Sequence, residues 1–280
     1  MTQIDHYAVF GHPISHSKSP RIHALFAEQT GQKLNYAARD VPTENFAAET
    51  KQFFAEGGKG LNCTVPLKEL AWAFADHLTE RARLGKAVNT LAKQADSRIL
   101  GDNTDGIGLV SDLTRNHGIT LTQTRILILG AGGATRGILA PMLERQPDCI
   151  VIANRTIEKA HAIANEFRLL GKVSASDYAN LAEQQFDVII NATSASLNGD
   201  LPPLPANVLK SGGYCYDLAY GNQPTAFVLW GREHQALQSL DGLGMLVEQA
   251  AEAFYVWRGI RPDTAPVIEL LDRERNTKFR

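Results

Sequence analysis

The strongest constraint in this sequence is an unbroken apolar run that ends in a glycine-rich turn. Residues 125–129 read Arg-Ile-Leu-Ile-Leu, and Gly130 follows directly. A strand that is apolar at successive positions is typical of a parallel sheet covered by helices on both faces. Similar runs occur at 149–153, 186–190 and 214–218, with helical stretches between them. The pattern predicts an open α/β sheet in the second half of the chain.

The first hundred residues predict another α/β unit. β-like runs at 6–10, 34–41 and 59–65 alternate with helical patterns, the order expected of parallel βαβ units. We expect Ser19 to cap the first helix, with Pro20 at its first position and Gly31 at its end. Thr43 is expected to cap the second helix.

Composition and charge exclude several classes of protein. The chain has 28 Lys and Arg against 30 Asp and Glu, and no basic stripe, so nothing favours nucleic-acid binding. Three cysteines without a Cys-x-x-Cys pair argue against a disulfide framework or a zinc ribbon. No His-Glu-x-x-His occurs, and we expect no metal site. Without a signal pattern or an apolar run near about 18 residues, we expect no membrane span and a cytoplasmic location.

The turn after the central apolar run has the context of a dinucleotide site. Gly130-Ala-Gly-Gly-Ala134 leaves a predicted strand and opens a predicted helix. Backbone N–H groups and the helix dipole at such a turn face a pyrophosphate. The third glycine of the usual pattern falls on Thr135, which leaves a plain glycine-rich turn as the alternative.

The end of the next strand indicates which nucleotide. An NAD site places a carboxylate there for the ribose hydroxyl, whereas an NADP site needs a cation for the 2′-phosphate. The chain has Asn154-Arg155-Thr156, with Lys159 one turn later. The planar fork of Arg155 suits a phosphate, so NADP is favoured. In the alternative, Arg155 only begins a solvated helix that Asn154 caps.

Polar residues gather where the predicted strands of the first half end. They are Ser15, Ser17, Thr64, Lys68, Asn89 and Asp105. The carboxyl ends of strands in an open α/β sheet form the ligand crevice, so we expect these side chains to converge. The set suits a small polyhydroxylated anion, although each residue by itself is common in turns or at helix starts.

Nine sequence blocks, taken together, cover nearly the whole chain. They are Phe10–Pro20, Asn62–Lys68, Ala87–Thr90, Gly101–Gly106, Gly130–Ala134, Asn154–Thr156, Asn191–Ser194, Tyr216–Tyr220 and Gly242–Gln249. In these blocks the sequence resembles the shikimate dehydrogenase family. The resemblance implies reduction of 3-dehydroshikimate to shikimate with NADPH, a step in making the aromatic amino acids.

The resemblance also implies roles for particular residues. Lys68 and Asp105 match the catalytic pair. The implied substrate ligands are Ser15, Ser17, Thr64, Lys68, Asn89, Asp105, Tyr220 and Gln249. The implied cofactor residues are Gly130, Ala131, Gly132, Gly133, Ala134, Asn154, Arg155, Thr156, Lys159, Leu218 and Gly242, with Glu80 as an addition. Gln249 lies in an apolar helical stretch, which favours an inward side chain over a solvated one.

Two positions depart from the family pattern. Lys86 stands where the family usually has glycine before Ala-Val-Asn-Thr, and Ser196 replaces a glycine after Asn-Ala-Thr-Ser. If position 196 requires a positive φ, serine costs stability or shifts the loop near the nicotinamide.

We therefore expect an α/β protein with an N-terminal substrate-binding and catalytic domain at 1–104 and a Rossmann-type NADP-binding domain at 105–241. Helical patterns at 245–259 and 266–273 have no strand left to pair with. We expect this C-terminal segment, 242–280, to pack on the substrate domain. The expected partner is a small-molecule substrate, shikimate or 3-dehydroshikimate, and the protein is expected to be a monomer or homodimer.

Three other functions match parts of the sequence. A relaxed member of the family would also oxidise quinate, with NADP or NAD. A non-catalytic NADP sensor would keep the glycine-rich turn but would have no use for Lys68 and Asp105 together. Ser15-His-Ser-Lys18 matches the Ser-x-x-Lys of a serine acyl-enzyme, but the partner motifs Ser-Asp-Asn and Lys-Thr-Gly are missing.

Overall fold

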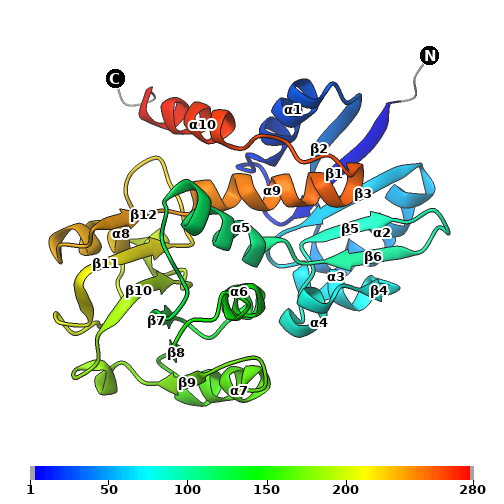
Figure 1. Ribbon diagram of the computed structural model, residues 1–280. Coiled ribbons are helices and arrows are strands. Elements are labelled where there is room, and N and C mark those ends of the chain that lie inside the picture. Colours follow the sequence, from blue (N-terminus) through cyan, green and yellow to red (C-terminus); the bar gives the residue numbers. More distant parts are fainter. Residues whose placement is uncertain (1–3, 278–280) are drawn as a thin grey trace. The chain divides into compact units, whose positions relative to one another are not determined.

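The computed structural model describes residues 4–277, which form two compact units (Figure 1). The first contains the described residues up to Gly108 together with Leu246–Leu270. The second contains Leu109–Met245 and the described residues from Leu271 onward. Both boundaries between consecutive segments lie four residues later than the sequence suggested (108 against 104, 245 against 241). The last helix is also divided, because its second half belongs to the second unit rather than the first.

The first unit contains a six-stranded mixed sheet in the order β2-β1-β3-β5-β6-β4. Its strands are β1 (Asp5–Gly11), β2 (Leu34–Asp40), β3 (Gly58–Cys63), β4 (His77–Leu78), β5 (Thr90–Lys93) and β6 (Ile99–Asp102). The expectation of purely parallel βαβ units is wrong for β5, which runs antiparallel to both neighbours. A tight hairpin causes this, since Gln94 N–H donates to the Arg98 carbonyl at 2.8 Å and Ser97 adopts φ 68°.

Helices cover both faces of this sheet. They include α1 (Ser19–Thr30), α2 (Phe46–Ala55), α3 (Lys68–Phe74), α4 (Glu80–Gly85) and most of α9 (Leu243–Arg258). The predicted end of α1 is confirmed, because Gly31 caps it in the left-handed conformation. The predicted N-caps are wrong: Ser19 is already helical and Thr43 opens a 3₁₀ turn, Thr43–Asn45, ahead of α2. The Ser17 hydroxyl instead accepts the N–H of Ser19 at 3.3 Å.

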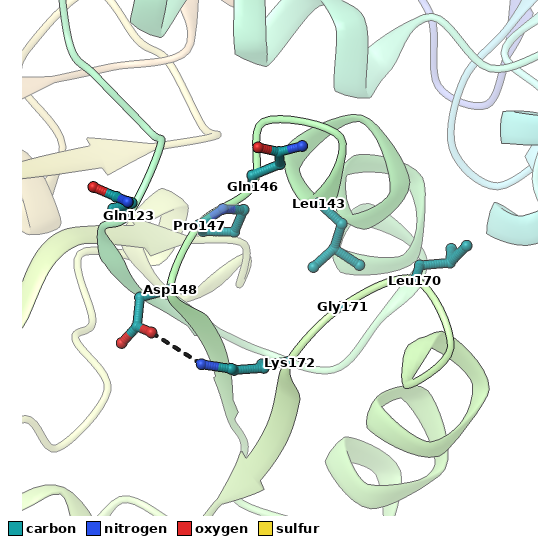
Figure 2. A pocket seen from close by; sticks show the side chains of 8 residues that line it. All are labelled: Gln123, Leu143, Gln146, Pro147, Asp148, Leu170, Gly171 and Lys172. Atoms are coloured by element: carbon teal, nitrogen blue, oxygen red, sulfur yellow. Dashed lines mark hydrogen bonds and ion pairs between the residues drawn. The ribbon is translucent and has the colours of Figure 1, made fainter.

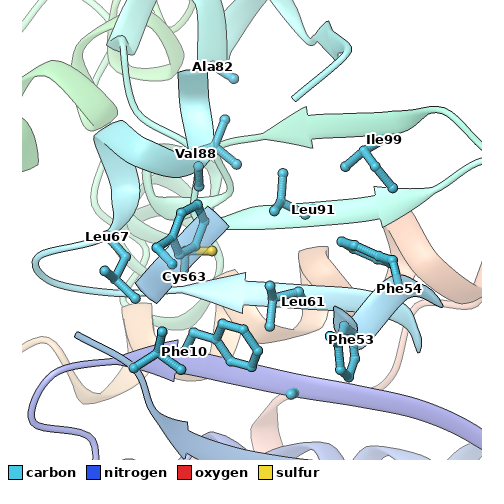
Figure 3. Packing of buried hydrophobic residues seen from close by; sticks show 14 residues of the cluster. Phe10, Phe53, Phe54, Leu61, Cys63, Leu67, Ala82, Val88, Leu91 and Ile99 are labelled. Carbon is cyan, nitrogen blue, oxygen red and sulfur yellow. The ribbon is translucent and has the colours of Figure 1, made fainter. Parts of the chain in front are cut away.

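The core of the first unit fixes the strands that carry its polar loops. Figure 3 shows Phe10 of β1, Leu61 of β3 and Leu91 of β5 packed with Phe53 and Phe54 of α2. The first three are fully buried, and the rings of Phe10 and Phe53 meet edge to face with centroids 5.9 Å apart. Such packing leaves the strands little freedom, so their carboxyl ends form a rigid edge.

The second unit contains an entirely parallel sheet in the order β12-β11-β10-β7-β8-β9. Its strands are β7 (Arg125–Leu129), β8 (Cys149–Ala153), β9 (Val173–Ser176), β10 (Phe186–Asn191), β11 (Leu209–Asp217) and β12 (Gln238–Leu240). The four predicted strands are confirmed. Residues 126–129 are fully buried, as expected of a strand covered on both faces.

The strand order of this sheet reverses at one place. Successive strands proceed in one direction from β7 through β9 and in the other from β10 through β12. The reversal lies between β7 and β10, which makes their carboxyl ends the topological switch point. The helices of this unit are α6 (Gly133–Leu143), α7 (Ile157–Phe167) and α8 (Ala226–Glu233), with 3₁₀ turns η3 (Ala179–Leu181) and η4 (Ala195–Asn198).

The buried carboxylate of Asp112 lies where the two ends of the segment Leu109–Met245 meet. Asp112 begins a π-helical turn, η2 (Asp112–Asn116), that continues α5 (Asp105–Ser111). It accepts hydrogen bonds from the Tyr216 hydroxyl at 2.6 Å and the Asn116 amide at 2.8 Å. Gly244, in the first turn of α9, approaches so closely that a Cβ there would lie 2.0 Å from Asp112 Oδ1. The chain therefore enters and leaves this unit at one place.

The remaining helix is α10 (Ala265–Thr277). Across residues 4–277, none of the helices has the length and apolar character needed to span a membrane.

Candidate active site

Two loops bring predicted substrate residues to the carboxyl edge of the first sheet. Ser15 and Ser17 follow β1, and Thr64 follows β3 directly. These strands are parallel neighbours, and the Thr64 N–H donates to the Phe10 carbonyl at 2.9 Å. His12 N–H in turn donates to the Val65 carbonyl at 3.2 Å. Backbone hydrogen bonds therefore hold the two loops together. The loops place the hydroxyls of Ser15, Ser17 and Thr64 at one edge of the sheet.

Lys68 and Asp105, predicted as a pair, are in direct contact. Lys68 is the first residue of α3 and Asp105 the first of α5. Lys68 Nζ lies 2.5 Å from Asp105 Oδ2, with side chains 29% and 14% exposed. The two side chains are thus partly shielded from water and still reachable from outside.

Cys63, the last residue of β3, is buried in the core of the first unit. Burial raises the pKa of its thiol well above the ordinary value, although the charge of Lys68 opposes the shift. Burial therefore favours the neutral thiol over the thiolate, which is the nucleophilic form.

Asn89 connects the residues around Asp105. Its amide nitrogen donates to Thr104 Oγ1 at 2.9 Å, Asp105 Oδ1 at 2.8 Å and Gln249 Oε1 at 3.3 Å. Its side-chain oxygen, Oδ1, accepts the backbone N–H of Thr104 at 2.9 Å. Because Asn89 is 3% exposed, these bonds have no competition from bulk water. Its orientation is therefore fixed by the protein.

Gln249 lies on α9 with its side chain directed to this network. Its amide nitrogen donates to the Leu246 carbonyl at 2.8 Å, and its oxygen faces Asn89. The side chain is half-buried, which agrees with an inward reading. The structure thus brings together Lys68, Asp105, Asn89 and Gln249 within the first unit.

The sequence did not single out two further members of the network. Thr104 is fully buried and bonds to Asn89 through both its N–H and its hydroxyl. Asn62 is also buried; it accepts the Tyr36 hydroxyl at 2.7 Å and donates to the Asn89 carbonyl at 3.0 Å. Asn62 lies in the Asn62–Lys68 block and Thr104 in the Gly101–Gly106 block. Membership of these blocks was the sequence signal that could have identified them.

The glycine-rich turn of the second unit joins β7 to α6. Gly130 follows β7 with φ 101°, and a Cβ there would lie 2.9 Å from Thr193 Cγ2. Gly132 and Gly133 begin α6 and would place a Cβ in open space. Thr135, at the third glycine position, is buried and donates its hydroxyl to the Gly130 carbonyl at 2.7 Å. Thr135 therefore braces the turn, and the start of α6, where helix N–H groups lack partners within the helix, follows the strand at the switch point.

The Asn154-Arg155-Thr156 segment follows β8, the neighbouring strand. Asn154 does not cap a helix as the alternative interpretation required, because α7 begins at Ile157 with Thr156 as its N-cap. The Asn154 amide instead donates to the Thr156 carbonyl at 2.8 Å, which folds the turn. Arg155 and Lys159 are both exposed. Two cations therefore flank the turn next to the glycine-rich loop.

Leu218 and Gly242 meet in the second unit. Gly242 N–H donates to the Ala219 carbonyl at 3.0 Å, and a Cβ on Gly242 would lie 2.3 Å from the Leu218 carbonyl oxygen. Tyr220, half-buried in the same segment, has its pKa raised by burial and by the charge of Asp241. Glu80 lies elsewhere: it is exposed at the start of α4 in the first unit, 3.7 Å from Arg83.

The two departures from the family pattern behave differently. Ser196 lies inside η4, and so does not adopt the positive φ that would have strained it. Its hydroxyl donates to Asp217 at 2.6 Å and accepts from the Asn191 amide at 3.1 Å. Burial raises the pKa of Asp217, and these donors oppose that shift. Lys86, by contrast, caps α4 with φ 49° in the left-handed region.

A pocket of about 510 Å³ lies at the other edge of the second sheet (Figure 2). Gln123, Asp148 and Lys172 line it, and they precede β7, β8 and β9 respectively. These are the amino ends of the strands, opposite the glycine-rich turn. The pocket therefore contains none of the predicted site residues.

A parallel sheet with a glycine turn at its switch point, and a separate unit with a Lys–Asp pair, define the class of two-domain dinucleotide-dependent dehydrogenases. Three family models match the chain: the shikimate dehydrogenase substrate binding domain at residues 9–91, shikimate / quinate 5-dehydrogenase at 112–198, and the shikimate 5′-dehydrogenase C-terminal domain at 242–271. The chain belongs to the shikimate dehydrogenase family.

Individual relatives agree with this assignment. A curated shikimate dehydrogenase (NADP(+)) of Methylococcus capsulatus is 62% identical over 277 residues, 99% of each chain. The structure of an Ael1 enzyme from Pseudomonas putida is 50% identical with a TM-score of 0.90, covering 95% of this chain and 98% of that one. Shikimate 5-dehydrogenase from Thermus thermophilus, solved with NADP(H) and shikimate, is 33% identical with a TM-score of 0.85, covering 97% and 100%.

Proposed function

We propose that this chain catalyses the reversible NADPH-dependent reduction of 3-dehydroshikimate to shikimate, in the biosynthesis of aromatic amino acids. The observation that carries the proposal is the contact between Lys68 Nζ and Asp105 Oδ2 at 2.5 Å, at the polar edge of the first sheet. The relatives named shikimate dehydrogenase (NADP(+)) support the choice of substrate and cofactor.

The proposed substrate ligands suit a small anion rich in hydroxyls. They are Ser15, Ser17, Thr64, Lys68, Asn89, Asp105, Gln249 and, from the second unit, Tyr220. Ser15 is exposed, while Ser17 and Thr64 are half-buried, so their hydroxyls are accessible. Hydroxyls, an amide and a carboxylate can each exchange hydrogen bonds with substrate hydroxyls, and Lys68 supplies positive charge.

Lys68 is proposed as the general acid. When NADPH is bound, it supplies the hydride. Negative charge then develops on the substrate carbonyl oxygen, and the Lys68 ammonium stabilises that charge and donates a proton to the oxygen. Asp105 holds Lys68 in place and accepts a hydrogen bond from a substrate hydroxyl. In the reverse direction, the neutral Lys68 amine takes the hydroxyl proton.

The residues of the second unit fit NADP. The proposal assigns the pyrophosphate to the turn from Gly130 to Ala134 and the ribose 2′-phosphate to Arg155 and Lys159, with Asn154 and Thr156 shaping their turn. Leu218 and Gly242 are proposed as further cofactor-binding residues, and Glu80 is an additional candidate. Open space in front of Gly132 and Gly133 supports the pyrophosphate position, since nothing in the described part of the protein fills it.

Absorbance at the nicotinamide band tests the proposal, with shikimate or quinate each paired with NADP⁺ or NAD⁺. We expect turnover with shikimate and NADP⁺. Comparable turnover of quinate would favour the relaxed enzyme, the second candidate, which the match to a shikimate / quinate family model supports. Absence of turnover in all four pairs would favour a non-catalytic NADP sensor.

The proposal includes a cytoplasmic location and a monomeric or homodimeric state. The free thiols of Cys63, Cys149 and Cys215 support a reducing compartment. Light scattering on the purified protein measures the oligomeric state, and fractionation of cells measures the location.

A further inference from the structure

A further ion-pair cluster of the first unit joins Arg81, Asp102 and Glu252. Arg81, on α4, donates to Asp102 through Nε at 2.7 Å and through Nη2 at 2.5 Å. The same Nη2 donates to Glu252 Oε1 on α9 at 2.9 Å. The side chains of Asp102 and Glu252 are 3% and 9% exposed, and that of Arg81 is 19% exposed. None of these three residues is among the proposed ligands, so the cluster has a role still to be explained.

Asp102 is hydrogen-bonded to Asn89 and to Asn103, and each of these residues bonds to Asp105. As the last residue of β6, it accepts the Asn89 N–H on its carbonyl at 3.0 Å. Its carboxylate accepts the N–H of Asn103 at 2.7 Å, and Asn103 Oδ1 accepts the N–H of Asp105 at 3.1 Å. The carboxylate that binds Arg81 therefore shapes the turn that leads to Asp105.

Glu252 connects the cluster to Gln249. The two residues are three apart on α9, so they lie on the same face of the helix. Gln249 faces Asn89 at 3.3 Å and Thr104 at 3.5 Å. Arg81 thus joins, through one guanidinium, the turn that carries Asp105 and the helix face that carries Gln249.

Arg81 supplies a positive charge that compensates the carboxylates of Asp102 and Glu252. Burial lowers the pKa of Arg81, but hydrogen bonds and charge from Asp102 and Glu252 outweigh burial and hold it above the ordinary value. Glu252 also accepts from Arg261, whereas Thr79 donates its neutral hydroxyl to Asp102 at 2.6 Å. Within residues 4–277, Arg81 is therefore the cation that pairs with Asp102, and without it the buried carboxylate, three residues before Asp105, would lack a compensating charge.

We propose that Arg81 is a positioning residue of the reaction centre, which sets the turn of Asp105 through Asp102 and the face of Gln249 through Glu252. The inference rests on the proposed function and deepens it. A planar guanidinium is required because it donates two hydrogen bonds to the carboxylate of Asp102 and a third to Glu252.

The test compares Arg81→Met, Arg81→Lys and Arg83→Met in shikimate oxidation. Arg83 lies on the same helix, is exposed and pairs only weakly with Glu80, so its variant controls for loss of a charge from α4. We expect Arg81→Met to lower kcat roughly 10- to 100-fold while leaving the KM for NADP⁺ within about twofold, because misplacement of a catalytic group acts on the chemical step. Arg81→Lys should recover part of kcat, and Arg83→Met should match the wild type.

A double-mutant cycle distinguishes positioning from general stability. If Arg81 acts through Asp102, the kcat losses of Arg81→Met and Asp102→Asn should not add in the double variant. A folded Arg81→Met enzyme with kcat within about twofold of wild type, or with losses that add fully, overturns the proposal. If Arg81→Met does not fold, the comparison of Arg81→Lys with wild type decides, and an undiminished kcat there overturns it equally.

Failure of the proposed function has a different signature. A wild-type enzyme inactive on shikimate contradicts that function whatever the variants do. The positioning role is then read from crystal structures of the wild type and Arg81→Lys: separation of Asp105 from Lys68 in the variant supports it, and an unchanged contact overturns it.

Discussion

The side-chain amide of Asn89 donates to Asp105 Oδ1 at 2.8 Å, on the carboxylate oxygen opposite the one that receives Lys68. Asp105 is therefore held from two sides, by a neutral donor and a cationic one. Both oxygens retain a second lone pair for a substrate hydroxyl. The carboxylate is in this way oriented by the protein itself, which in the proposed reaction would lower the cost of ordering it.

Replacement of Lys68 by alanine should remove the general acid. We expect kcat to fall by about 10² to 10⁴, with a smaller change in the KM for shikimate, because the lysine acts mainly in the transition state. Steady-state kinetics measure both values. Lys59→Ala, at an exposed position on β3, is the matched control and should behave as wild type. A near-normal kcat in Lys68→Ala would contradict the proposed role.

Replacement of Arg155 by alanine should affect NADPH but not NADH. Hydrogen bonds to a charged group contribute about 1.5 to 3 kcal/mol, so we expect the KM for NADPH to rise roughly 10- to 100-fold. The KM for NADH, which lacks the 2′-phosphate, should hardly change. Arg168→Ala removes the same charge from an exposed site just after α7 and should leave both values alone. Equal losses with both cofactors would argue against a phosphate contact.

Lys86→Gly should stabilise the protein. Lys86 has φ 49° at the end of α4, and a left-handed backbone costs a residue with a Cβ about 1 to 2 kcal/mol. Glycine offsets part of this gain through the entropy of its unfolded chain, so we expect a net gain of about 0.5 to 1 kcal/mol. Urea unfolding measures the difference. Lys86→Ala keeps the Cβ and should give no such gain; an equal gain in both variants would mean that strain is not the cause.

Gly244→Ala should destabilise the second unit. The added Cβ would lie 2.0 Å from Asp112 Oδ1, and Tyr216 and Asn116 hold that carboxylate in place. Overpacking of this kind costs about 1 to 3 kcal/mol. Gly133→Ala is the control, because its Cβ would enter open space, and its unfolding free energy should change by less than about 0.5 kcal/mol. Similar unfolding free energies for the two variants would show that the contact is not tight.

His23 should make the protein sensitive to acid. Burial lowers the pKa of His23 to about 3, whereas in the unfolded chain it is about 6.5. Below pH 6.5 the unfolded state therefore binds a proton that the folded state refuses, and stability falls as pH falls towards 3. Between pH 6.5 and 4.5 this amounts to about 2 to 3 kcal/mol.

The variant His23→Phe isolates that effect. Its ring can keep the stack on Tyr36, whose centroid lies 4.2 Å from that of His23, but it cannot take up a proton. We expect urea unfolding of this variant to depend less steeply on pH than that of the wild type over the same interval. Identical slopes in the two proteins would assign the acid sensitivity to other groups.

Features set by neighbouring residues were the ones that the sequence predicted well. The apolar run at 125–129 and Gly130 were sufficient to predict a buried strand and the turn after it, because burial on both faces leaves a pattern in a few consecutive positions. Gly31 ended α1 as predicted, since a left-handed C-cap strongly favours glycine.

Features set by distant residues were missed. Arg81 and Asp102 are 21 positions apart and Arg81 and Glu252 are 171 apart, so only the fold shows that they form one cluster. β5 was not seen to be antiparallel, because the hairpin at 94–98 uses Ser97 in the left-handed conformation without an Asn-Gly signal. Ser19 resembled a cap in sequence, but the helix had already begun there.

The close approach of Gly244 to Asp112 has a consequence for modularity. The segment Leu109–Met245 begins and ends at nearly one point, as inserted domains do. A shortened chain of these residues should therefore fold and bind NADPH without its flanking sequence. It would lose the contacts that Arg275 of α10 makes with Asp241 and with the Gly221 carbonyl. The nucleotide-binding half of the protein is in this sense a separable module. A short linker in its place should be able to join the two parts of the chain that flank it.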